Sequence, residues 1–382
     1  MKVVVAIDSF KGSMSTFQAA NAVAIGIKRV YPDADVKGSP LADGGEGTVD
    51  AIIAANKGEM QTVSVCGPHT RSVDASYGIL RCTGTAVMEM AAAAGITMVS
   101  GAEKNPLYTT TYGVGEMIKD AIEKGCRKFL IGIGGSATND GGVGMLQALG
   151  FEFLDTKGNE IRKGAAGLED LCEIKDDNAL PELQDCEFAV ACDVKNPLCG
   201  SNGCSAIYGP QKGATPEMIK IMDKHLGEYA KLTKKVNPDA DENYPGAGAA
   251  GGLGFAFKAY LGAELKPGID IVIEATELEK YVKDADIVVT GEGRLDGQSC
   301  MGKAPIGVST LAKKYGKTVI AFAGCVTDDA IECNNHGIDA FFPIVRKPCS
   351  LEDAMDIENA KKNLADTAEQ AFRLVKTFGK VN

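Results

Sequence analysis

Five apolar runs along the chain have the length and composition of buried strands. They cover residues 2–8, 128–134, 286–292, 318–324 and 340–345, and four of the five end in a polar or glycine-rich turn. Helical periodicity appears between or after them, at residues 16–30, 112–123, 306–315 and 351–378. Strands that alternate with helices in this way predict a parallel sheet covered by helices on both faces, with its ligand site beyond the carboxyl ends of the strands.

A different pattern occupies residues 63–95, where short strand-like segments follow one another with turns between them. This series is typical of a mixed or antiparallel sheet and predicts a second domain, to which we also assign residues 187–194 and 245–257. The predicted fold class is α/β, with one Rossmann-like domain that has a mainly parallel sheet and one domain that has a mixed sheet. The predicted Rossmann-like domain is discontinuous, with residues 1–62, 96–148 and 278–382, and the second takes residues 63–95 and 149–277.

The composition indicates a globular protein that acts on a small molecule. The 382 residues are 45% hydrophobic and 24% charged, which fits two domains of roughly 100–200 residues each. A formal charge of −11 disfavours nucleic acid and anionic membranes as partners. No apolar run reaches the ~18 residues that a membrane span requires. We therefore expect a small-molecule substrate, no nucleic acid and no membrane; the oligomeric state stays open, with a homodimer as one arrangement.

The cysteines and histidines exclude some chemistry. Twelve cysteines without a CxxC pair, and a first strand at residue 2 with no signal peptide before it, predict a cytoplasmic protein. Zinc binding is disfavoured because Cys199 and Cys204 have no histidine near them in the sequence. Of the three histidines, His225 and His336 fit surface positions, whereas His69 stays open as a functional residue.

Residues 128–150 carry the strongest chemical signal. A strand-like run is followed by six glycines between Gly132 and Gly144, with hydroxyl, amide and carboxylate side chains among them. Small residues allow backbone N–H groups to approach an anion, and the helical pattern that follows directs its positive end at the loop. The pattern predicts a phosphate-binding loop, and the same composition also fits a glycine-rich turn that only packs tightly.

Two further motifs are weaker. Gly246, Gly248 and Gly251 spell GxGxxG, but polar, turn-forming residues precede them in place of the strand that a dinucleotide site requires. Residues 297–304 nearly match the P-loop pattern and follow a credible strand, yet Ala304 stands where a magnesium-binding hydroxyl is needed. We reject the first motif, and the second leaves Lys303 as a weaker candidate for phosphate contact.

Polar, glycine-bounded loops recur along the chain, most of them after an apolar run. They cover residues 8–13, 40–48, 132–142, 191–200 and 290–299. Turns use such residues anyway, but five loops exceed what turn preferences alone explain. Carboxylates offer magnesium ligands or a base, and cations neutralise phosphate or carboxylate. Together these groups suit phosphoryl transfer, in which positioning and charge neutralisation dominate.

In this order and at this spacing, the loops DSFKGS, PLADGGEGT, GIGGSATNDGGVGML, ACDVKNPL and GEGRLD resemble the bacterial glycerate kinase type I family over nearly the whole chain. The resemblance implies two α/β domains with the active-site cleft between them. It also implies a glycerate 2-kinase that uses ATP and Mg²⁺ to phosphorylate D-glycerate, usually at the 2-hydroxyl, giving 2-phospho-D-glycerate and ADP.

Three residues are predicted to act in catalysis. We expect Asp193 to orient or deprotonate the glycerate hydroxyl, Lys11 to neutralise the γ-phosphate and Arg294 to hold a carboxylate or phosphate in its planar fork. Each has a structural alternative. Asp193 also fits a turn cap and Lys11 a solvated side chain, and Arg294 also fits an ion pair with Asp296 or Glu292.

The other predicted site residues group by ligand. The predicted substrate-binding residues are Asp43, Gly44, Gly45, Glu46, Lys195, Asn196 and Asp296. The predicted nucleotide-binding residues are Ser9, Gly12, Ser13, Gly134, Gly135, Ser136, Thr138, Asn139 and Asp140. The predicted magnesium ligands are Asp8 and Glu292, with Asp43 and Glu46 as a further pair for magnesium or substrate hydroxyls.

Two other functions stay open from the sequence. Gly132, Gly134 and Ala137 form a GxGxxA pattern that fits an NAD-dependent hydroxy-acid dehydrogenase, although no acidic residue follows at the distance that holds a ribose. A regulator that binds a sugar acid without turnover would keep the same fold. Thermal stabilisation by ATP with magnesium, by NADH or by glycerate alone separates the three classes.

Overall fold

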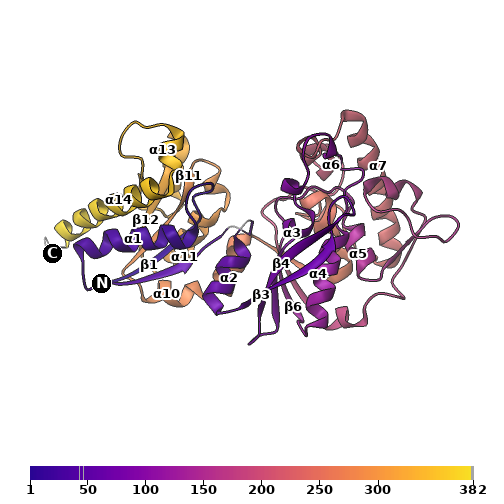
Figure 1. The fold of residues 1–382 in the computed structure, drawn as a ribbon, viewed down its shortest axis with the longest axis horizontal. Coiled ribbons are helices and arrows are strands. Elements are labelled where there is room, and N and C mark those ends of the chain that lie inside the picture. The colour runs from indigo at the N-terminus through magenta and orange to yellow at the C-terminus, as the bar shows by residue number, and fades with distance from the viewer. Residues whose placement is uncertain (43, 46, 380–382) are drawn as a thin grey trace. The chain divides into compact units, whose positions relative to one another are not determined.

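A computed structural model describes residues 1–42, 44–45 and 47–379 of the chain. The chain forms two compact units (Figure 1). Unit 1 comprises Met1–Asp43, Asp50–Asn56 and Ile269–Asn382, and unit 2 comprises Gly44–Val49 and Lys57–Gly268. Unit 1 is therefore assembled from both ends of the chain, whereas nearly all of unit 2 is one continuous segment.

Unit 1 is built on a five-stranded sheet in the order β13-β12-β11-β1-β2, and every neighbouring pair in it is parallel. The strands are β1 (Lys2–Ile7), β2 (Asp35–Pro40), β11 (Ile287–Leu295), β12 (Thr318–Val326) and β13 (Ala340–Pro343). The helices are α1 (Thr16–Val30), α2 (Thr48–Asn56, of which 50–56 belong here), α9 (Gly268–Ala275), α10 (Leu278–Asp284), α11 (Ala304–Lys314), α12 (Glu332–Asn335), α13 (Leu351–Met355) and α14 (Ile357–Phe378).

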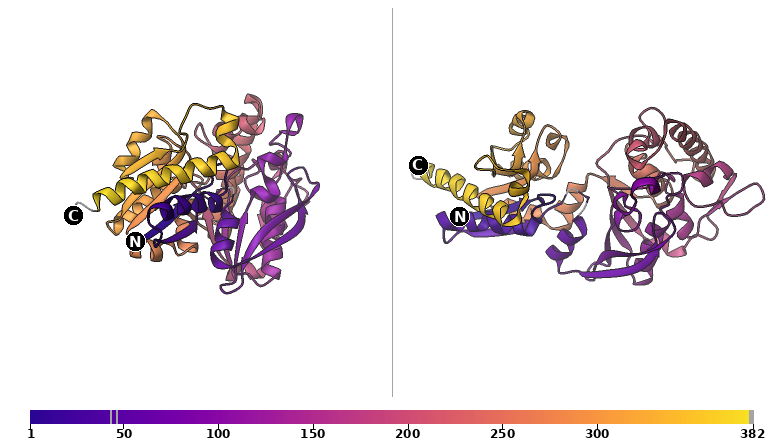
Figure 2. Two further views of the ribbon diagram at one scale, coloured as in Figure 1. Left: turned by 60° about the vertical axis from the view of Figure 1, so that its left-hand side comes forward. Right: turned by 45° about the horizontal axis from the view of Figure 1, so that its top comes forward.

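Both faces of this sheet are covered. Side chains alternate across a strand, so Val3, Val5 and Ile7 of β1 enter one core with the apolar faces of α1 and α14. Val4 and Ala6 point the opposite way and are also buried, on the side where α10 and α11 contact the strands. Figure 2 shows α14 running alongside α1 over the sheet. Helix α1 begins at a capping box in which the Ser15 hydroxyl accepts from Gln18 N and the Gln18 side chain accepts from Ser15 N.

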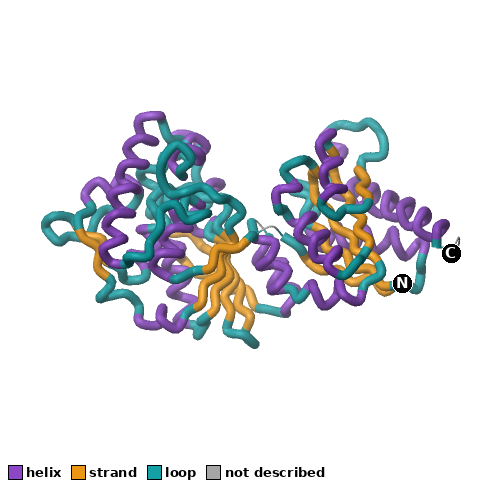
Figure 3. Tube along the Cα trace, turned by 180° about the vertical axis from the view of Figure 1, so that it is seen from behind, coloured by secondary structure: helices purple, strands orange, loops and turns teal. Residues whose placement is uncertain are grey.

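Unit 2 is built on a six-stranded mixed sheet in the order β10-β9-β6-β5-β4-β3, whose strands form a twisted fan in Figure 3. The strands β5, β6, β9 and β10 are parallel to one another, and β3-β4-β5 are antiparallel. The strands are β3 (Glu59–Cys66), β4 (Ser72–Leu80), β5 (Thr85–Glu89), β6 (Lys128–Gly132), β9 (Glu187–Ala191) and β10 (Glu264–Lys266). A separate two-stranded antiparallel sheet is formed by β7 (Glu152–Leu154) and β8 (Glu173–Lys175). The helices are α3 (Ala91–Ala94), α4 (Tyr112–Glu123), α5 (Val143–Ala148), α6 (Cys204–Tyr208), α7 (Pro216–Val236) and α8 (Leu253–Leu261).

The predicted fold class is confirmed, because one sheet is parallel and the other is mixed. The units differ from the predicted division most clearly at residues 96–148. These residues lie in unit 2, since β6 pairs with β5 and β9 rather than with any strand of the parallel sheet. Smaller differences place residues 44–49 and 57–62 in unit 2 and residues 269–277 in unit 1. Among the described residues, the helices are all too short or too polar to span a bilayer.

Candidate functional site

In unit 1, polar residues emerge at the carboxyl ends of the adjacent strands β1 and β11. Asp8 follows β1 directly and is buried, with its N–H donating to Gly291 O at 2.9 Å. Its Oδ1 accepts from Ser9 N at 2.6 Å. A side chain at Gly293 would lie 3.5 Å from Lys11 N, so the loop after β1 passes directly over β11. The two neighbouring strands thus bring Asp8 and Glu292 to the same edge of the sheet.

Glu292 is tied to the turn that follows β11. The Ser299 hydroxyl is fully buried and donates to Glu292 Oε1 at 2.6 Å, while it accepts from Asp296 N at 3.2 Å. Asp296 Oδ1 accepts from the N–H groups of Gln298 and Ser299 at 3.0 and 3.1 Å. Arg294 is mostly exposed, and its Nε lies 3.3 Å from Asp296 Oδ2. Arg294 therefore makes the ion pair that was the structural alternative for it, with its side chain 65% exposed.

Replacement of Ser299 with Ala is expected to lower the free energy of unfolding by about 1–3 kcal/mol, because the half-buried Glu292 carboxylate and a backbone N–H lose their shared partner. Urea denaturation measures this difference. Ser64→Ala is the matched control, since its hydroxyl pairs with that of Ser72 at 2.7 Å on an exposed strand surface, where water replaces the lost contact. Equal losses in the two variants would contradict the role given to Ser299.

In unit 2, glycine residues allow four chain segments to meet at the carboxyl ends of the parallel strands. A side chain at Gly132, the last residue of β6, would lie 2.5 Å from Gly44 O. A side chain at Gly44, whose φ is +87°, would lie 2.8 Å from both Ala191 Cβ and Gly268 Cα. The predicted glycine residues of the 40–48 loop are therefore packed against the ends of β6 and β9. Thr48 fixes the same loop by donating its hydroxyl proton to Gly45 O at 2.7 Å.

Asp193 lies two residues beyond β9 and is exposed. Its Oδ1 accepts from Gly268 N at 2.9 Å, so the carboxylate is held to the segment after β10. Lys195 is exposed nearby in the chain. Asn196 has a structural role, because its Nδ2 donates to Asn202 O at 2.8 Å and its Oδ1 accepts from the Tyr208 hydroxyl at 2.7 Å. The structure thus presents Asp193 at the sheet edge and engages Asn196 within its own loop.

The 132–142 loop is divided into an exposed part and a buried part. Gly134 and Gly135 are exposed, and Ser136 lies at their edge with 8% of its surface accessible. Thr138 and Asn139 are fully buried, and Asn139 Nδ2 donates to Ser205 Oγ at 2.8 Å. Of the predicted nucleotide-binding residues, Gly134 and Gly135 thus have an exposed backbone, whereas the side chains of Thr138 and Asn139 face the interior of the unit.

Asp140 is also buried and organises the loop from within. Its carboxylate accepts from Thr111 N at 2.8 Å, Thr111 Oγ1 at 3.0 Å, and Gly142 N at 3.2 Å. Burial raises the pKa of the Asp140 carboxyl, and the hydrogen bonds from Thr111 and Gly142 oppose that rise. The Thr111 hydroxyl accepts in turn from Met145 N at 3.0 Å in helix α5. Asp140 therefore joins the loop, the start of α4 and the start of α5.

A residue that sequence reasoning missed lies beneath this loop. Lys212 is 2% exposed, and its Nζ donates to Ser136 Oγ at 2.7 Å and to Thr138 O at 2.6 Å. Burial lowers the pKa of its ammonium group to about 8. In the sequence, Lys212 lies between Pro210 and Gly213, which indicates a turn, but no strand precedes this turn to suggest a binding loop.

The remaining predicted residues have varied settings. Ser9 and Ser13 are half-buried, and Gly12 is exposed with a φ of +78° in the turn between Phe10 and Met14. Asp43 and Glu46 lie outside the described residues. His69 is half-buried in the turn between β3 and β4. Across residues 1–42, 44–45 and 47–379, no three His, Cys, Asp or Glu side chains form a group able to enclose a metal ion.

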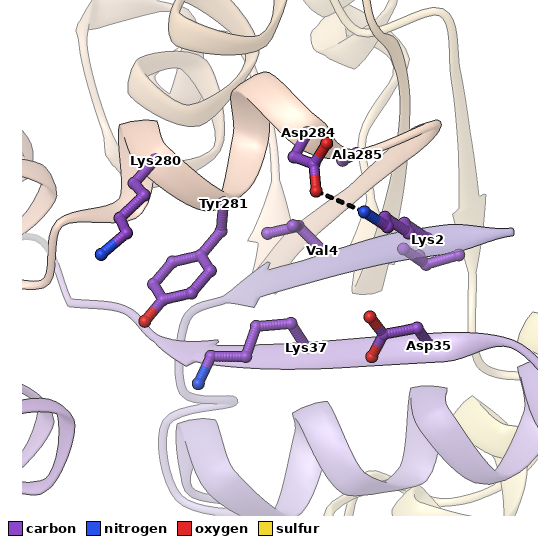
Figure 4. Close-up of a pocket in the computed structure, with 9 residues that line it drawn as sticks. Lys2, Val4, Asp35, Lys37, Lys280, Tyr281, Asp284 and Ala285 are labelled. Atoms are coloured by element: carbon purple, nitrogen blue, oxygen red, sulfur yellow. Dashed lines mark hydrogen bonds and ion pairs between the residues drawn. The ribbon is translucent and has the colours of Figure 1, made fainter.

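One surface pocket of about 260 Å³ lies elsewhere in unit 1, along β1, β2 and α10 (Figure 4). Lys37 Nζ lies 4.8 Å from the centre of the Tyr281 ring, and Lys2 Nζ lies 2.5 Å from Asp284 Oδ2. The pocket opens at the amino-terminal residues of β1, whereas ligand sites of parallel sheets lie at carboxyl ends. We therefore place the functional residues at the strand ends and not in this pocket.

The chain is similar to known proteins over nearly its whole length. Residues 3–376 match the model of the family described as "Glycerate kinase family". The chain is 48% identical to glycerate 2-kinase of Escherichia coli K12, covering 98% of this chain and 99% of that one, and 46% identical to glycerate kinase of Bacillus subtilis 168, covering 99% of each. A crystal structure from Salmonella typhimurium LT2, described as glycerate kinase 2, matches with a TM-score of 0.91 and 46% identity, covering 100% of this chain and 99% of the other.

Proposed function

The chain belongs to the glycerate kinase family, and we propose that it transfers the γ-phosphoryl group of ATP to the 2-hydroxyl of D-glycerate, giving 2-phospho-D-glycerate and ADP. Membership of this family makes the chain a kinase that phosphorylates glycerate. The proposal adds ATP as the donor, Mg²⁺ as the metal, the 2-hydroxyl as the acceptor and the cytoplasm as the location.

The setting of Asp193 is the observation that carries the mechanism. Its Oδ1 is engaged by Gly268 N, which fixes the carboxylate while the side chain remains exposed at the carboxyl end of β9. A carboxylate in this position suits a base that accepts the proton of a substrate hydroxyl as the phosphoryl group arrives. Phosphoryl transfer requires little from the protein beyond positioning and charge neutralisation, so one anchored carboxylate is sufficient to accept the proton.

The close-packed loops of unit 2 supply the positioning in this proposal. Gly44 and Gly45 present backbone groups beside the ends of β6 and β9, and Lys195 supplies a cation in the loop that carries Asp193. We assign the glycerate hydroxyl to Asp193 and the glycerate carboxylate to Lys195 with the Gly44–Gly45 backbone. The exposed backbone of Gly134 and Gly135 suits an anionic oxygen, as small residues at a strand end do in general.

The carboxyl ends of β1 and β11 suit a nucleotide with magnesium. Mg²⁺ is usually held by one or two carboxylates together with substrate phosphates, so Asp8 and Glu292 are enough from the protein side. Asp8 follows β1 and Glu292 lies on the neighbouring strand β11, and hydrogen bonds from Ser9 and Ser299 orient the two carboxylates. The ion would neutralise phosphate charge and orient the transferred group. Lys11, Arg294 and the hydroxyl groups of Ser9 and Ser13 would contact the phosphates.

A phosphorus NMR time course with the purified protein, D-glycerate, ATP and Mg²⁺ tests the proposal directly. We expect a 2-phosphoglycerate resonance to grow as ATP declines, and only when glycerate is present. A 3-phosphoglycerate resonance would retain the kinase and correct the acceptor hydroxyl. If ATP consumption does not depend on glycerate, the proposed activity is wrong.

Replacement of Lys11 with Met is expected to lower kcat by about 100-fold, because one cation that neutralises the transferring phosphoryl group is removed. Steady-state kinetics with both substrates measures the effect. Lys280→Met is the matched control. Lys280 is an exposed lysine of the same unit whose nearest carboxylate, Glu277, lies 3.8 Å away, and it belongs to the pocket of Figure 4. Unchanged kcat and KM values in the Lys11 variant would exclude it from the site.

A further inference from the structure

Lys212 is a buried cation at a place where the fold gives it no contacting carboxylate among the described residues. Its 3-10 turn (Pro210–Lys212) places the ammonium group under the 132–142 loop, where it contacts a hydroxyl and a backbone carbonyl. Burying an ammonium group is costly unless its charge is used or compensated. Ser136 lies 76 residues away in the sequence, so the contact is created by the tertiary fold and not by a local turn.

The charged and titratable neighbours of Lys212 leave its charge largely uncompensated. Cys204 and Asp140 are the groups that favour the protonated lysine, and burial outweighs both. Burial raises the pKa of the Cys204 thiol to about 11, so this group is neutral at pH 7. Asp140 is turned to Thr111 and Gly142. From the remaining neighbouring segment, Lys104 packs its backbone carbonyl against Gly213.

The contact with Lys212 determines which hydrogen bonds remain open to the Ser136 hydroxyl. A serine hydroxyl has one proton to donate and two lone pairs that accept. Because the lysine ammonium group can only donate, Ser136 Oγ is the acceptor in this bond, and its own proton is left for another partner. Ser136 keeps 8% of its surface accessible and directly follows the exposed Gly134 and Gly135. A hydroxyl polarised by a cation on one side is a strong donor to an anionic oxygen on the other.

We infer that Lys212 is a positioning residue of the kinase, which acts through Ser136 to bind an anionic oxygen of a substrate at the Gly134–Ser136 turn. The inference rests on the proposed function for the identity of that substrate, whose anionic group is either a phosphate of ATP or the carboxylate of glycerate. Lys212 itself remains buried. It supplies positive charge beneath the turn and directs the Ser136 hydroxyl proton outward.

A purely structural lysine predicts a different result. If Lys212 only joined two parts of the loop, its removal would lower stability and would change all kinetic parameters together. A positioning role predicts a selective rise in the KM of the substrate whose anion is bound. It also predicts that binding weakens as pH rises through about 8, because protonated Lys212 is the competent form and is lost above its pKa.

The test uses the full chain with Lys212→Met, which keeps the length of the side chain and removes its charge, and Ser136→Ala, which keeps Lys212 and its bond to Thr138 O. Steady-state kinetics from pH 6.5 to 9.5 gives KM for ATP and for D-glycerate. We expect a 10- to 100-fold rise in one KM for Lys212→Met and about a tenfold rise in the same KM for Ser136→Ala. The decline of kcat/KM above pH 8 should be lost in Lys212→Met. A rise for ATP assigns a phosphate to the turn, and a rise for glycerate assigns the carboxylate.

Ser205→Ala is the matched control, since Ser205 is a buried serine of the same layer that accepts from Asn139 and does not contact Lys212. It should lower the melting temperature without changing either KM. If Lys212→Met does not fold, Ser136→Ala against Ser205→Ala decides the question. Unchanged KM values in Ser136→Ala, or a pH profile that persists in Lys212→Met, would overturn the inference.

A failure of the proposed kinase activity can be told apart from a failure of this inference. Calorimetric titration with ADP and with D-glycerate measures anion binding without turnover. A wild-type protein that makes no phosphoglycerate but binds one of these anions 10-fold or more tightly than Ser136→Ala does would exclude the kinase activity and support the role of Lys212. An active wild-type protein that binds these anions no more tightly than Ser136→Ala does would support the kinase activity and exclude the role of Lys212.

Discussion

Replacement of Asp193 with Asn is expected to lower kcat by a factor of about 10²–10⁴, with KM values for ATP and glycerate close to those of the unmodified chain. The amide oxygen of Asn can still accept from Gly268 N, so the loop keeps its position. The amide cannot accept the proton of the glycerate hydroxyl, and the step that depends on the base is lost. Rapid-quench and steady-state assays at saturating substrates measure this loss.

The matched control for this variant is Asp223→Asn. Asp223 also accepts a hydrogen bond from a glycine backbone, with Gly200 N at 2.8 Å from its Oδ1, and it lies in helix α7 of the same unit. It should retain full turnover, because Asp193, and not Asp223, is proposed to meet substrate. Near-normal kcat in Asp193→Asn would reduce Asp193 to the cap of a turn, the structural alternative for this residue.

Replacement of Gly44 with Ala is expected to have the second large effect. The new Cβ would lie 2.8 Å from Ala191 Cβ and from Gly268 Cα, and the φ of +87° is itself unfavourable for a side chain by about 1–2 kcal/mol. The loop has to move away from the ends of β6 and β9. A displacement of about 1 Å in such a site costs on the order of 100-fold in rate. We therefore expect kcat/KM to fall by about 100-fold and the free energy of unfolding to fall by about 3 kcal/mol.

Gly47→Ala separates crowding from backbone strain. Gly47 has nearly the same φ, +89°, but a side chain there would meet no atom within 4 Å. This variant should lose only about 1–2 kcal/mol of stability and little activity. If both variants behave alike in kinetics and in denaturation, close packing at Gly44 is not what positions the loop.

Much of this arrangement is predictable because local rules apply to it. A polar residue at the end of an apolar run is expected near the carboxyl end of a strand, which is why Asp8, Glu292 and Asp193 were predicted as site residues. The glycine-rich segment 128–150 was expected either to bring backbone N–H groups to an anion or only to pack tightly, and the contact of Gly132 with Gly44 is an instance of tight packing. These properties depend on a few neighbouring residues, and the sequence displays them directly.

Other features depend on partners far away in the chain. Residues 128–134 read as a strand of a parallel sheet, but the choice between two sheets is made by pairing with β5 and β9. Thr138 and Asn139 have the composition of an exposed polar loop, yet they are buried, and Asn139 pairs with Ser205 from 66 positions away. Lys212 was missed for the same reason, since its partner Ser136 is equally remote. A buried polar group looks like an exposed one until its partner is known.

The assembly of unit 1 from both ends of the chain has a consequence for the order of folding during synthesis. Strand β1 is made first, but its neighbour β11 begins at Ile287, and the apolar face of α1 is covered by α14, which ends at Phe378. Most of unit 2, residues 57–268, is complete long before then and can fold as it leaves the ribosome. The first forty residues can form the β1–β2 pair, but Val23 and Ile27 of α1 stay exposed until α14 emerges. Chains that end before α14 therefore offer chaperones and proteases the apolar face of α1.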